Sequence, residues 1–460
     1  MRDITDCFAN EGDYPRLDMS GAAERLSAAI RCRTVTDGAD YSAFDALQRH
    51  MRESYPAVMA AGSFETVGHS VLITLPGSDD SLRPALLMSH QDVVPVVRGT
   101  EKDWTYPPFS GEIAEGYIWG RGALDIKQQV FGVLEAAEYL LAQGKQFSRR
   151  VYLAFGEDEE TFNTGSRAIA ELLRQRGAEL EFVLDEGGGR IQSGAAYGAP
   201  GALVSQIDIA EKGYADLELS VESRGGHSSR PFGGTSLGIL AQAIARIVEA
   251  PFPARLNGAL RKSFEALSDK IVQEPLHSLT ADMDNSAEAL AGYCLGVEEL
   301  FPLVTTTVAP TVIRGGSDAC NVMPQNMSAV INFRLAPGTE TGEVLEHCRQ
   351  AVNDDRVTLR FLQANDPSEV ARTDGLGYAA VKRAMERYYD GVCFIPSMTA
   401  GATDARSYEL VCDTCLRCSP FMANDEDVRR GVHGTDERIS LRAYAQGIRA
   451  LICLLESCCL

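Results

Sequence analysis

Several candidate catalytic side chains stand where a predicted strand ends, and the first of them is a histidine. His90 closes an apolar run at residues 84–90, and Asp92 follows two positions later. In an extended segment, side chains at positions i and i+2 project to the same side, so Asp92 can hydrogen-bond the imidazole and fix its tautomer for metal binding. Such a pair is also common in ordinary polar loops, so it indicates a metal site only together with other ligands.

A run of four acids leaves the next apolar strand. Residues 157–160 read Glu-Asp-Glu-Glu and follow the strand predicted at residues 149–155. Charge runs are usually solvated surface. This run leaves a buried strand and precedes a helix, so some of its side chains must face a cleft. Adjacent carboxylates in a cleft can serve as a metal ligand and a general base.

Three other residues have side chains suited to metal binding. Asp125 lies in the glycine-bracketed turn GRGALDIK, although a helix N-cap is the usual role of such an aspartate. Asp185 ends a third apolar strand, residues 181–185, and His433 precedes the last helix. With Glu159 left over as a candidate base, five residues make up the ligands of a two-metal hydrolase with one bridging carboxylate: His90, Asp125, Glu160, Asp185 and His433.

These side chains can meet only if the strands that carry them lie in one sheet. Between residues 20 and 210, apolar strands alternate with helices, and the pattern returns after residue 370 and ends in a helix at residues 440–456. Continuous apolar strands between helices are typical of a parallel sheet buried on both faces, whose sites lie at the carboxyl ends of the strands. We therefore expect an α/β catalytic domain with a mostly parallel sheet, built from residues 1–212 and 370–460.

A smaller domain interrupts this pattern at residues 213–369. Its predicted elements follow the order β-α-β-β-α-β, typical of a ferredoxin-like α+β fold: strands at 214–223, 305–316, 327–338 and 356–363, and helices at 235–249 and 340–353. A mostly helical stretch at residues 252–304 lies between the first helix and the second strand. We expect this stretch to extend the smaller domain.

The composition narrows the classes of function. The chain of 460 residues has 43 Lys plus Arg against 64 Asp plus Glu, a formal net charge of −21. We expect no nucleic acid or anionic membrane as a partner, since both favour a basic surface. No apolar run approaches the roughly 18 residues of a membrane span, and the N-terminal residues do not resemble a signal peptide. We therefore expect a cytoplasmic protein whose 12 cysteines are free thiols.

Three of the cysteines follow one another at CxxCxxC spacing: Cys412, Cys415 and Cys418. This spacing can hold zinc or an iron–sulfur cluster. A fourth partner at a standard spacing is missing, so we expect no separate metal site here.

Four of the seven histidines match no motif and are expected to be surface or structural residues: His50, His69, His277 and His347.

Eight segments occur in an order that resembles a known family: MSHQDVVPV, W-x3-PFSG-x8-GRGALDIK, GEDEE, RGGHSSRP, GGSDACNVMP, NFRLAPG, GATDAR and GVHGTDE. Over nearly its whole length, the chain is similar to the dinuclear-zinc exopeptidases that include aminoacylase-1, succinyl-diaminopimelate desuccinylase and carboxypeptidase S. The tryptophan-to-PFSG segment looks most like the carboxypeptidase S branch, which also contains N-acyl-amino-acid hydrolases. The resemblance implies a zinc-exopeptidase catalytic domain whose inserted domain acts as a lid and dimerisation domain.

For the metal site, the resemblance implies two divalent ions per subunit, most readily zinc, although cobalt or manganese suit the same oxygen-rich ligands. Asp92 would orient one ligand, and Asp125, followed by a cis peptide, would bridge the two metals. Glu159 would be the general base. The other ligands would be His90, Glu160, His433 and Asp185, with Glu186 as the alternative to Asp185.

For the substrate, the resemblance implies residues on the lid. His227, in RGGHSSRP, would reach the active site of the partner subunit in a homodimer and stabilise the oxyanion. Arg334 would hold the substrate carboxylate, which suits the fork of an arginine. Four further residues match substrate-contacting positions: Asn321, and Gly401, Ala402 and Thr403, whose backbone N–H groups would help to bind the same carboxylate.

Together these residues predict a metal-dependent hydrolase of the carboxypeptidase, dipeptidase or aminoacylase type. It would cleave the amide bond next to an amino acid with a free carboxylate, in a dipeptide or an N-acyl amino acid. One alternative is a catalytically silent relative that binds peptides or metabolites, but the base and every ligand are present. Another is a dinuclear aminopeptidase without an inserted domain, which the RGGHSSRP motif and the insertion argue against.

Overall fold

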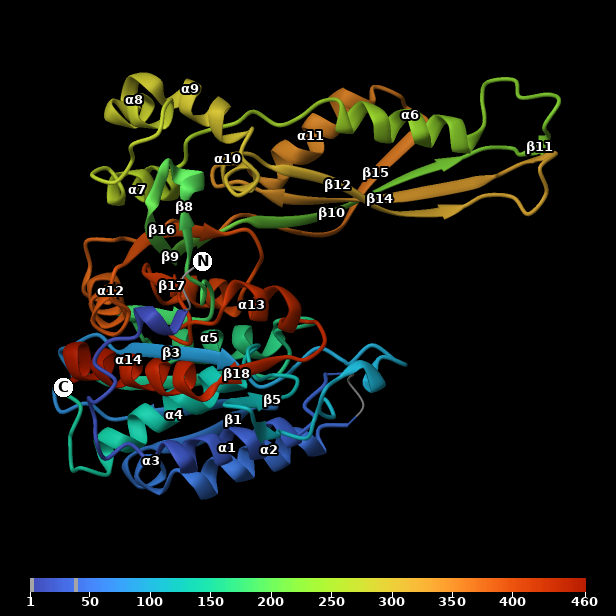
Figure 1. Ribbon diagram of the computed structural model, residues 1–460. Helices are drawn as coiled ribbons and strands as arrows, with labels where there is room; N and C mark the ends of the chain where they lie inside the picture. Colours follow the sequence, from blue (N-terminus) through green and yellow to red (C-terminus); the bar gives the residue numbers. More distant parts are fainter. Residues whose placement is uncertain (1–3, 37–39) are drawn as a thin grey trace.

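The chain forms a large α/β unit and an elongated smaller unit, joined by two extended segments (Figure 1). The computed structural model describes residues 4–36 and 40–460. Within these two ranges, none of the helices combines the length and the apolar character needed to cross a membrane.

A nine-stranded sheet forms the centre of the larger unit. Its strands are β1 (Ser63–Val67), β2 (Ser70–Leu75), β3 (Ala85–His90), β6 (Val151–Gly156), β7 (Phe182–Asp185), β8 (Gln192–Gly194), β9 (Ala199–Glu211), β16 (Val392–Thr399) and β17 (Cys415–Arg417). They lie in the order β1-β2-β6-β3-β7-β17-β9-β16, with β8 beside β9. The central strands β6, β3, β7 and β17 run parallel to one another. The prediction of an α/β unit with a largely parallel sheet is confirmed.

Alternate side chains of β3 enter two different hydrophobic cores. Ala85 and Leu87 pack into the core that lies under α1 (Met19–Arg31), α4 (Lys127–Leu141), α12 (Leu376–Tyr388) and α14 (Leu441–Cys459). Leu86 and Met88 pack on the other face of the sheet, under α5 (Thr164–Gln175). A strand that is covered on both faces has no polar side, which explains its continuous apolar sequence.

The smaller unit is an antiparallel sheet with helices on one face. Its strands, in the order β12-β14-β10-β15, are β12 (Thr307–Gly315), β14 (Asn326–Leu335), β10 (Gly213–Glu222) and β15 (Val357–Asn365), and its helices are α6 (Ser236–Val248) and α11 (Thr341–Val352). These elements share a separate core, and they follow the predicted β-α-β-β-α-β order. We call this smaller unit the lid. At its far end, a ribbon of β11 (Gly226–His227) and β13 (Val322–Met323) forms the tip of the lid (Figure 1).

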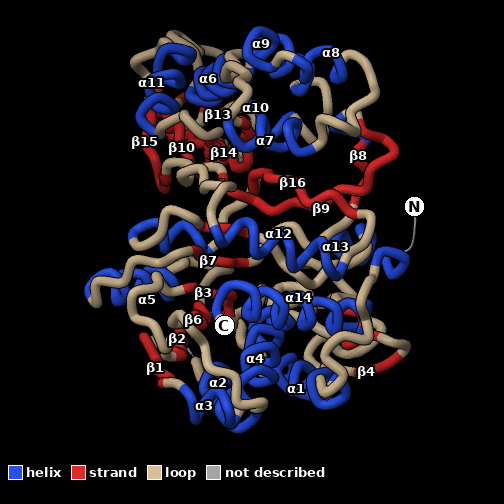
Figure 2. Tube along the Cα trace, turned by 90° about the vertical axis from the view of Figure 1, so that its left-hand side faces the viewer, coloured by secondary structure: helices blue, strands red, loops and turns tan. Residues whose placement is uncertain are grey.

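The helical stretch between these elements does not extend the smaller unit, contrary to the prediction. It contains α7 (Gly258–Ala266), α8 (Leu276–Ala281), α9 (Met283–Cys294) and α10 (Phe301–Val304). Leu260, Phe264 and Leu290 belong to the core of the larger unit, and the centroids of the Phe264 and Tyr197 rings lie 5.9 Å apart. Figure 2 shows α7 on one side of β9 and β16 and α12 on the other. The amphipathic pattern identified the helices, but it does not say which apolar surface they cover.

Two segments cross between the units side by side. The Ser368 N–H donates to the Glu211 carbonyl (3.1 Å), and the Glu211 N–H donates to the Ser368 hydroxyl (2.8 Å). Next to Glu211, the Lys212 Nζ donates to the carbonyl oxygens of Pro302 (2.7 Å) and Thr305 (2.8 Å). These contacts fasten the hinge between the units to the end of the helical stretch.

Candidate metal centre

His90, at the carboxyl end of β3, directs one ring nitrogen toward a cluster of carboxylates. Its Nδ1 lies 3.0 Å from the backbone oxygen of Asp92 and 3.3 Å from the Asp92 Oδ1, so Nδ1 carries the proton as the donor. Its Nε2 lies 3.2 Å from Asp125 Oδ1 and 3.3 Å from Glu186 Oε1. Among the described residues, the buried Nε2 has no hydrogen-bond partner. An imidazole whose Nε2 faces two carboxylates in this way is suited to binding a metal ion.

Asp125 joins this group to a second one. Its Oδ2 lies 3.0 Å from Nε2 of His433, and the same nitrogen lies 3.2 Å from Glu160 Oε2. Two groups of possible metal ligands result, and Asp125 belongs to both: His90, Asp125 and Glu186, and Asp125, Glu160 and His433. The peptide bond between Asp125 and Ile126 is cis, as the sequence resemblance implied.

The electrostatics of the cluster favour a cation. Hydrogen bonds that His433 donates to the carboxylates of Asp125 and Glu160 raise the pKa of His433 to about 10, which means that the surrounding carboxylates attract positive charge. The Glu160 Oε1 is buried and, within the described part of the chain, lacks a hydrogen-bond partner. Imidazole and carboxylate ligands in two groups that share one aspartate fit a pair of divalent ions.

Asp185 and Glu186, the two alternatives for one metal ligand, lie in different surroundings. The two oxygens of the Asp185 carboxylate accept the backbone N–H groups of Glu186 and Ala405, each at 2.8 Å. Glu186, not Asp185, extends toward His90. Neighbouring residues of a strand point to opposite sides. Assigning the ligand to Asp185 instead of Glu186 therefore moves it from one side of β7 to the other.

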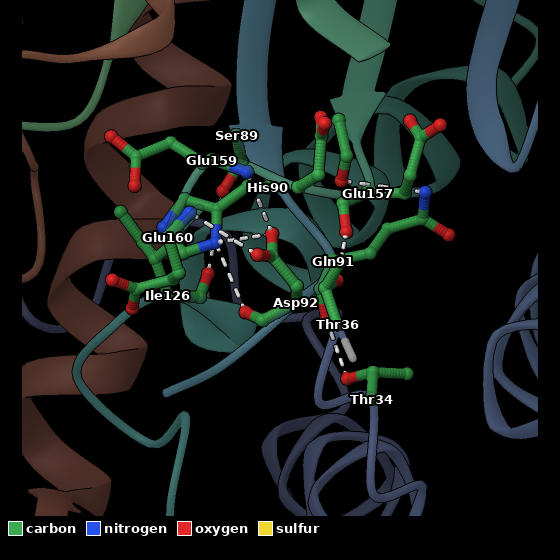
Figure 3. Close-up of polar contacts among 12 residues, drawn as sticks. Thr34, Thr36, Ser89, His90, Gln91, Asp92, Ile126, Glu157, Glu159 and Glu160 are labelled. Carbon is green, nitrogen blue, oxygen red and sulfur yellow. Dashed lines mark hydrogen bonds and ion pairs between the residues drawn. The ribbon is translucent and has the colours of Figure 1, made fainter. Parts of the chain in front are cut away.

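Asp92 holds the acidic loop as well as the histidine. Its fully buried carboxylate accepts the backbone N–H groups of Glu159 and Glu160, both at 3.2 Å, and its Oδ1 also lies 3.3 Å from Nδ1 of His90 (Figure 3). The loop is thereby fixed with Glu160 in the ligand cluster. Burial raises the pKa of the neighbouring Glu159 carboxyl well above its ordinary value, and His90 opposes this effect.

A buried ion pair connects the two loops that carry Asp125 and His433, and we call it the Arg121–Glu437 clasp. The Glu437 carboxylate is fully buried and accepts the Arg121 Nη1 at 2.6 Å. Its Oε1 also accepts three backbone N–H groups of the turn before and at Asp125, at 2.8 to 3.0 Å: Gly122, Leu124 and Asp125. Arg121 Nη2 donates to the carbonyl of Gly434, directly after His433 (2.8 Å).

Sequence reasoning missed this clasp, although both residues stand inside recognised segments. Arg121 belongs to GRGALDIK and Glu437 to GVHGTDE. A charged residue near a metal ligand is usually interpreted as a surface residue or as a substrate-binding residue. Only the burial of Arg121 and Glu437 shows that they hydrogen-bond backbone groups of the two loops.

The residues predicted on the lid do not gather around this cluster within one chain. His227 and Asn321 lie together at the tip of the lid, where the Ser228 N–H donates to the Asn321 carbonyl (2.9 Å), and both residues are exposed. Figure 1 shows that this tip lies far from the end of β3. Arg334 lies at the other end of the lid, near the hinge, with its guanidinium 4.7 Å from the centre of the Tyr214 ring.

The predicted carboxylate-binding loop lies beside the hinge. The Thr403 N–H and hydroxyl donate to Glu211 Oε2 at 3.1 and 2.9 Å, and Thr403 is buried. Ala402 is exposed and Gly401 is partly exposed. In this conformation Thr403 is therefore hydrogen-bonded to the hinge residue Glu211, and Gly401 and Ala402 are the more exposed residues of the loop.

Comparisons with known proteins agree with this geometry. The model of a family described as "Peptidase family M20/M25/M40" matches residues 86–457. The N-fatty-acyl-amino acid synthase/hydrolase PM20D1 of Xenopus tropicalis is 35% identical, with 94% of this chain and 85% of the relative covered. The probable carboxypeptidase S-like 2 of Dictyostelium discoideum is 31% identical, with 92% and 82% covered.

Solved structures share the fold at low sequence identity. A metallo-carboxypeptidase of the M20 family from Sulfolobus solfataricus, Sso-CP2, superposes with a TM-score of 0.68 at 17% identity and covers 95% of this chain and 98% of its own. Human carnosine dipeptidase 1 gives a TM-score of 0.64 at 16% identity, with 96% and 97% covered.

Proposed function

Because the chain belongs to the peptidase family M20/M25/M40 and is a metal-dependent hydrolase, we propose that it hydrolyses the amide bond of N-acyl amino acids that carry a free carboxylate. The observation that carries this proposal is Asp125, which lies between His90 and His433 and takes part in both ligand groups. The names of the PM20D1 and carboxypeptidase S-like relatives support an acyl or peptidyl substrate.

The metal ligands in this proposal are His90, Asp125, Glu160, Glu186 and His433. Two divalent ions, which we propose to be zinc, would lower the pKa of a shared water and polarise the scissile carbonyl. Glu159 takes the proton from this water and passes it to the leaving amine. The raised pKa of the buried Glu159 carboxyl supports this role, since a base must hold a proton between the two transfers.

The lid and the hinge region supply the remaining groups. Arg334, at the hinge end of the lid, and the loop of residues 401–403, which follows β16 of the larger unit, bind the free carboxylate of the amino acid. His227 and Asn321 act in the active site of the partner subunit of a homodimer, where His227 donates to the developing oxyanion. The position of His227 at the exposed tip of the lid, far from its own metal centre, supports this exchange.

We also propose a cytoplasmic location. All 12 cysteines are free thiols. This state suits a reducing compartment.

A substrate panel tests the function. The metal-loaded protein is incubated with N-acyl amino acids and with dipeptides of the same C-terminal amino acid, and release of that amino acid is measured with and without a chelator. We expect chelator-sensitive release, faster from the N-acyl compounds. The Glu159→Gln variant is the control, and we expect it to retain both metals while its kcat falls by roughly 10²- to 10⁴-fold. Release that persists in this variant would transfer the role of base to another residue, and no release by metal-loaded wild type would contradict the proposed function.

A further inference from the structure

A pocket lies at the opposite end of the sheet from the candidate metal centre. His90, Glu160 and Glu186 lie at the carboxyl ends of β3, β6 and β7. This pocket is lined by residues that precede strands, among them Arg83 before β3, Leu180 before β7 and Val411 before β17. Its volume is about 680 Å³. Cys412 and Cys415 both line it, and they retain exposed fractions of 7% and 4%.

The two cysteines of this pocket are hydrogen-bonded to each other. The Cys415 thiol donates to the backbone carbonyl of Cys412 at 3.9 Å, and the Thr414 N–H donates to the Cys412 sulfur at 3.3 Å. The neighbouring Cys415 side chain, the Thr414 N–H and the guanidinium of Arg83 together lower the pKa of Cys412. By contrast, burial raises the pKa of Cys418, which does not line the pocket.

The backbone favours a reaction between these two sulfurs. Cys415 is fixed in β17, where it pairs with Val183 of β7. Cys412 lies three residues earlier, before the strand begins, on the segment whose Val411 carbonyl accepts the Leu180 N–H. One partner is therefore held in a strand while the other stands on a connecting segment, and the hydrogen bond from the Cys415 thiol to the Cys412 carbonyl keeps the two residues next to each other.

We propose that Cys412 and Cys415 are a redox-active dithiol, which small-molecule disulfides reach through this pocket. The Cys412 thiolate attacks one sulfur of the small disulfide, the S–S bond of that molecule breaks, and one thiol leaves. Cys415 then loses its proton and attacks the Cys412 sulfur, which releases the second thiol and forms the Cys412–Cys415 disulfide. The small disulfide has gained two electrons and two protons, and the protein has lost them. This inference is independent of the proposed hydrolytic function.

Peptide mapping can test the proposal because of where trypsin cuts. Cleavage after Arg406 and Arg417 leaves Cys412 and Cys415 in one peptide and places Cys418 in the next. The folded, metal-loaded protein is incubated with oxidised glutathione, its remaining thiols are blocked with iodoacetamide, and the peptides are analysed by mass. We expect the peptide of residues 407–417 to lose two hydrogen atoms and to escape blocking, and we expect dithiothreitol to reverse both changes.

Three variants separate the steps. Cys415→Ser should stop the reaction at a mixed disulfide between glutathione and Cys412. Cys412→Ser should leave Cys415 without glutathione, because the attacking thiolate is missing. Cys418→Ser is the matched control, since it removes a buried thiol of the same segment outside the pocket, and it should form the Cys412–Cys415 disulfide as wild type does.

Reaction rates give a second measurement on wild-type protein. In the folded protein, iodoacetamide should modify Cys412 at least roughly tenfold faster than Cys418, because a thiolate that is open to a pocket reacts faster than a buried thiol. The proposal is overturned if the peptide of residues 407–417 keeps both free thiols in excess oxidised glutathione, or if Cys412 reacts no faster than Cys418.

Discussion

The Glu437 carboxylate accepts the backbone N–H of Asp125 at 3.0 Å, although the two residues are 312 positions apart in the chain. Through Arg121, the same carboxylate is connected to the loop that carries His433. One buried side chain thus fixes the turn that carries Asp125 and the loop that carries His433. The geometry of both groups of possible ligands depends on a residue that belongs to neither group.

Replacing Glu437 by Gln should weaken metal binding. The variant leaves the Arg121 guanidinium buried without a carboxylate and loosens the turn at Asp125, so we expect the metal affinity to fall by roughly 10- to 100-fold. We also expect a loss of stability of about 3–5 kcal/mol, as for other broken buried pairs. Metal titration of the apo protein and denaturant unfolding measure the two effects.

A matched control for this variant is Glu135→Gln. Glu135 is buried and pairs with Arg25 at 2.6 Å, and this pair joins α1 to α4 away from the metal centre. The control should lose stability but keep its metal affinity. Equal metal affinities for Glu437→Gln and wild type would show that the clasp only stabilises the fold.

Exchanges at residues 185 and 186 should have different effects on metal content. Glu186→Gln removes a carboxylate next to His90, so we expect the protein to hold one tightly bound ion instead of two. Asp185→Asn keeps an oxygen that can accept a backbone N–H, so both ions should remain. Elemental analysis after dialysis measures the content, and the opposite pattern would restore Asp185 as the ligand.

Mixing two inactive variants should restore activity if His227 acts in the partner subunit. A dimer of one His227→Ala and one Glu159→Ala subunit has one intact site out of two. Random reassociation of equal amounts makes half of the dimers mixed, so we expect about one quarter of the wild-type activity. The measurement requires that mixed dimers are first shown by differently tagged subunits. Their formation without recovery of activity would place the catalytic role of His227 within its own chain or remove it.

The hinge lysine should make stability depend on pH. Burial, together with the charge of Arg334, lowers the pKa of Lys212 from its ordinary value of 10.5 to about 7. Between these two values the folded protein has released the proton and the unfolded chain still binds it. The free energy of unfolding of wild type, relative to Lys212→Met, should therefore rise with pH by about 1.4 kcal/mol per unit from about pH 7 to 10. Urea unfolding of both proteins across this range checks the slope, and parallel curves would contradict a neutral Lys212.

The sequence predicted the features that depend on local patterns. Apolar runs indicated β3, β6 and β7, and the acids and histidine after them indicated the end of the sheet where a site would form. The change of periodicity after Gly213 indicated the second unit. These features follow from side-chain alternation and helix periodicity, which a single chain displays directly.

The features that the sequence did not predict correctly depend on contacts between distant segments. Asp185 and Glu186 differ by one position, and only the backbone N–H of Ala405, more than 200 residues away, shows which of them is already engaged. The apolar faces of α7 and α9 were recognisable, but their partner is the larger core rather than the lid. The roles of Arg121 and Glu437 became visible only when both loops were placed together.

The clasp also sets an order in time. A ribosome makes His90, Asp125, Glu160 and Glu186 first, and His433 follows Glu186 only after 247 further positions. Over that stretch of synthesis, the nascent chain carries four of the five proposed ligands without Glu437, the residue that holds the Asp125 turn. The proposed metal centre can therefore take its final geometry only after residue 437 has been added.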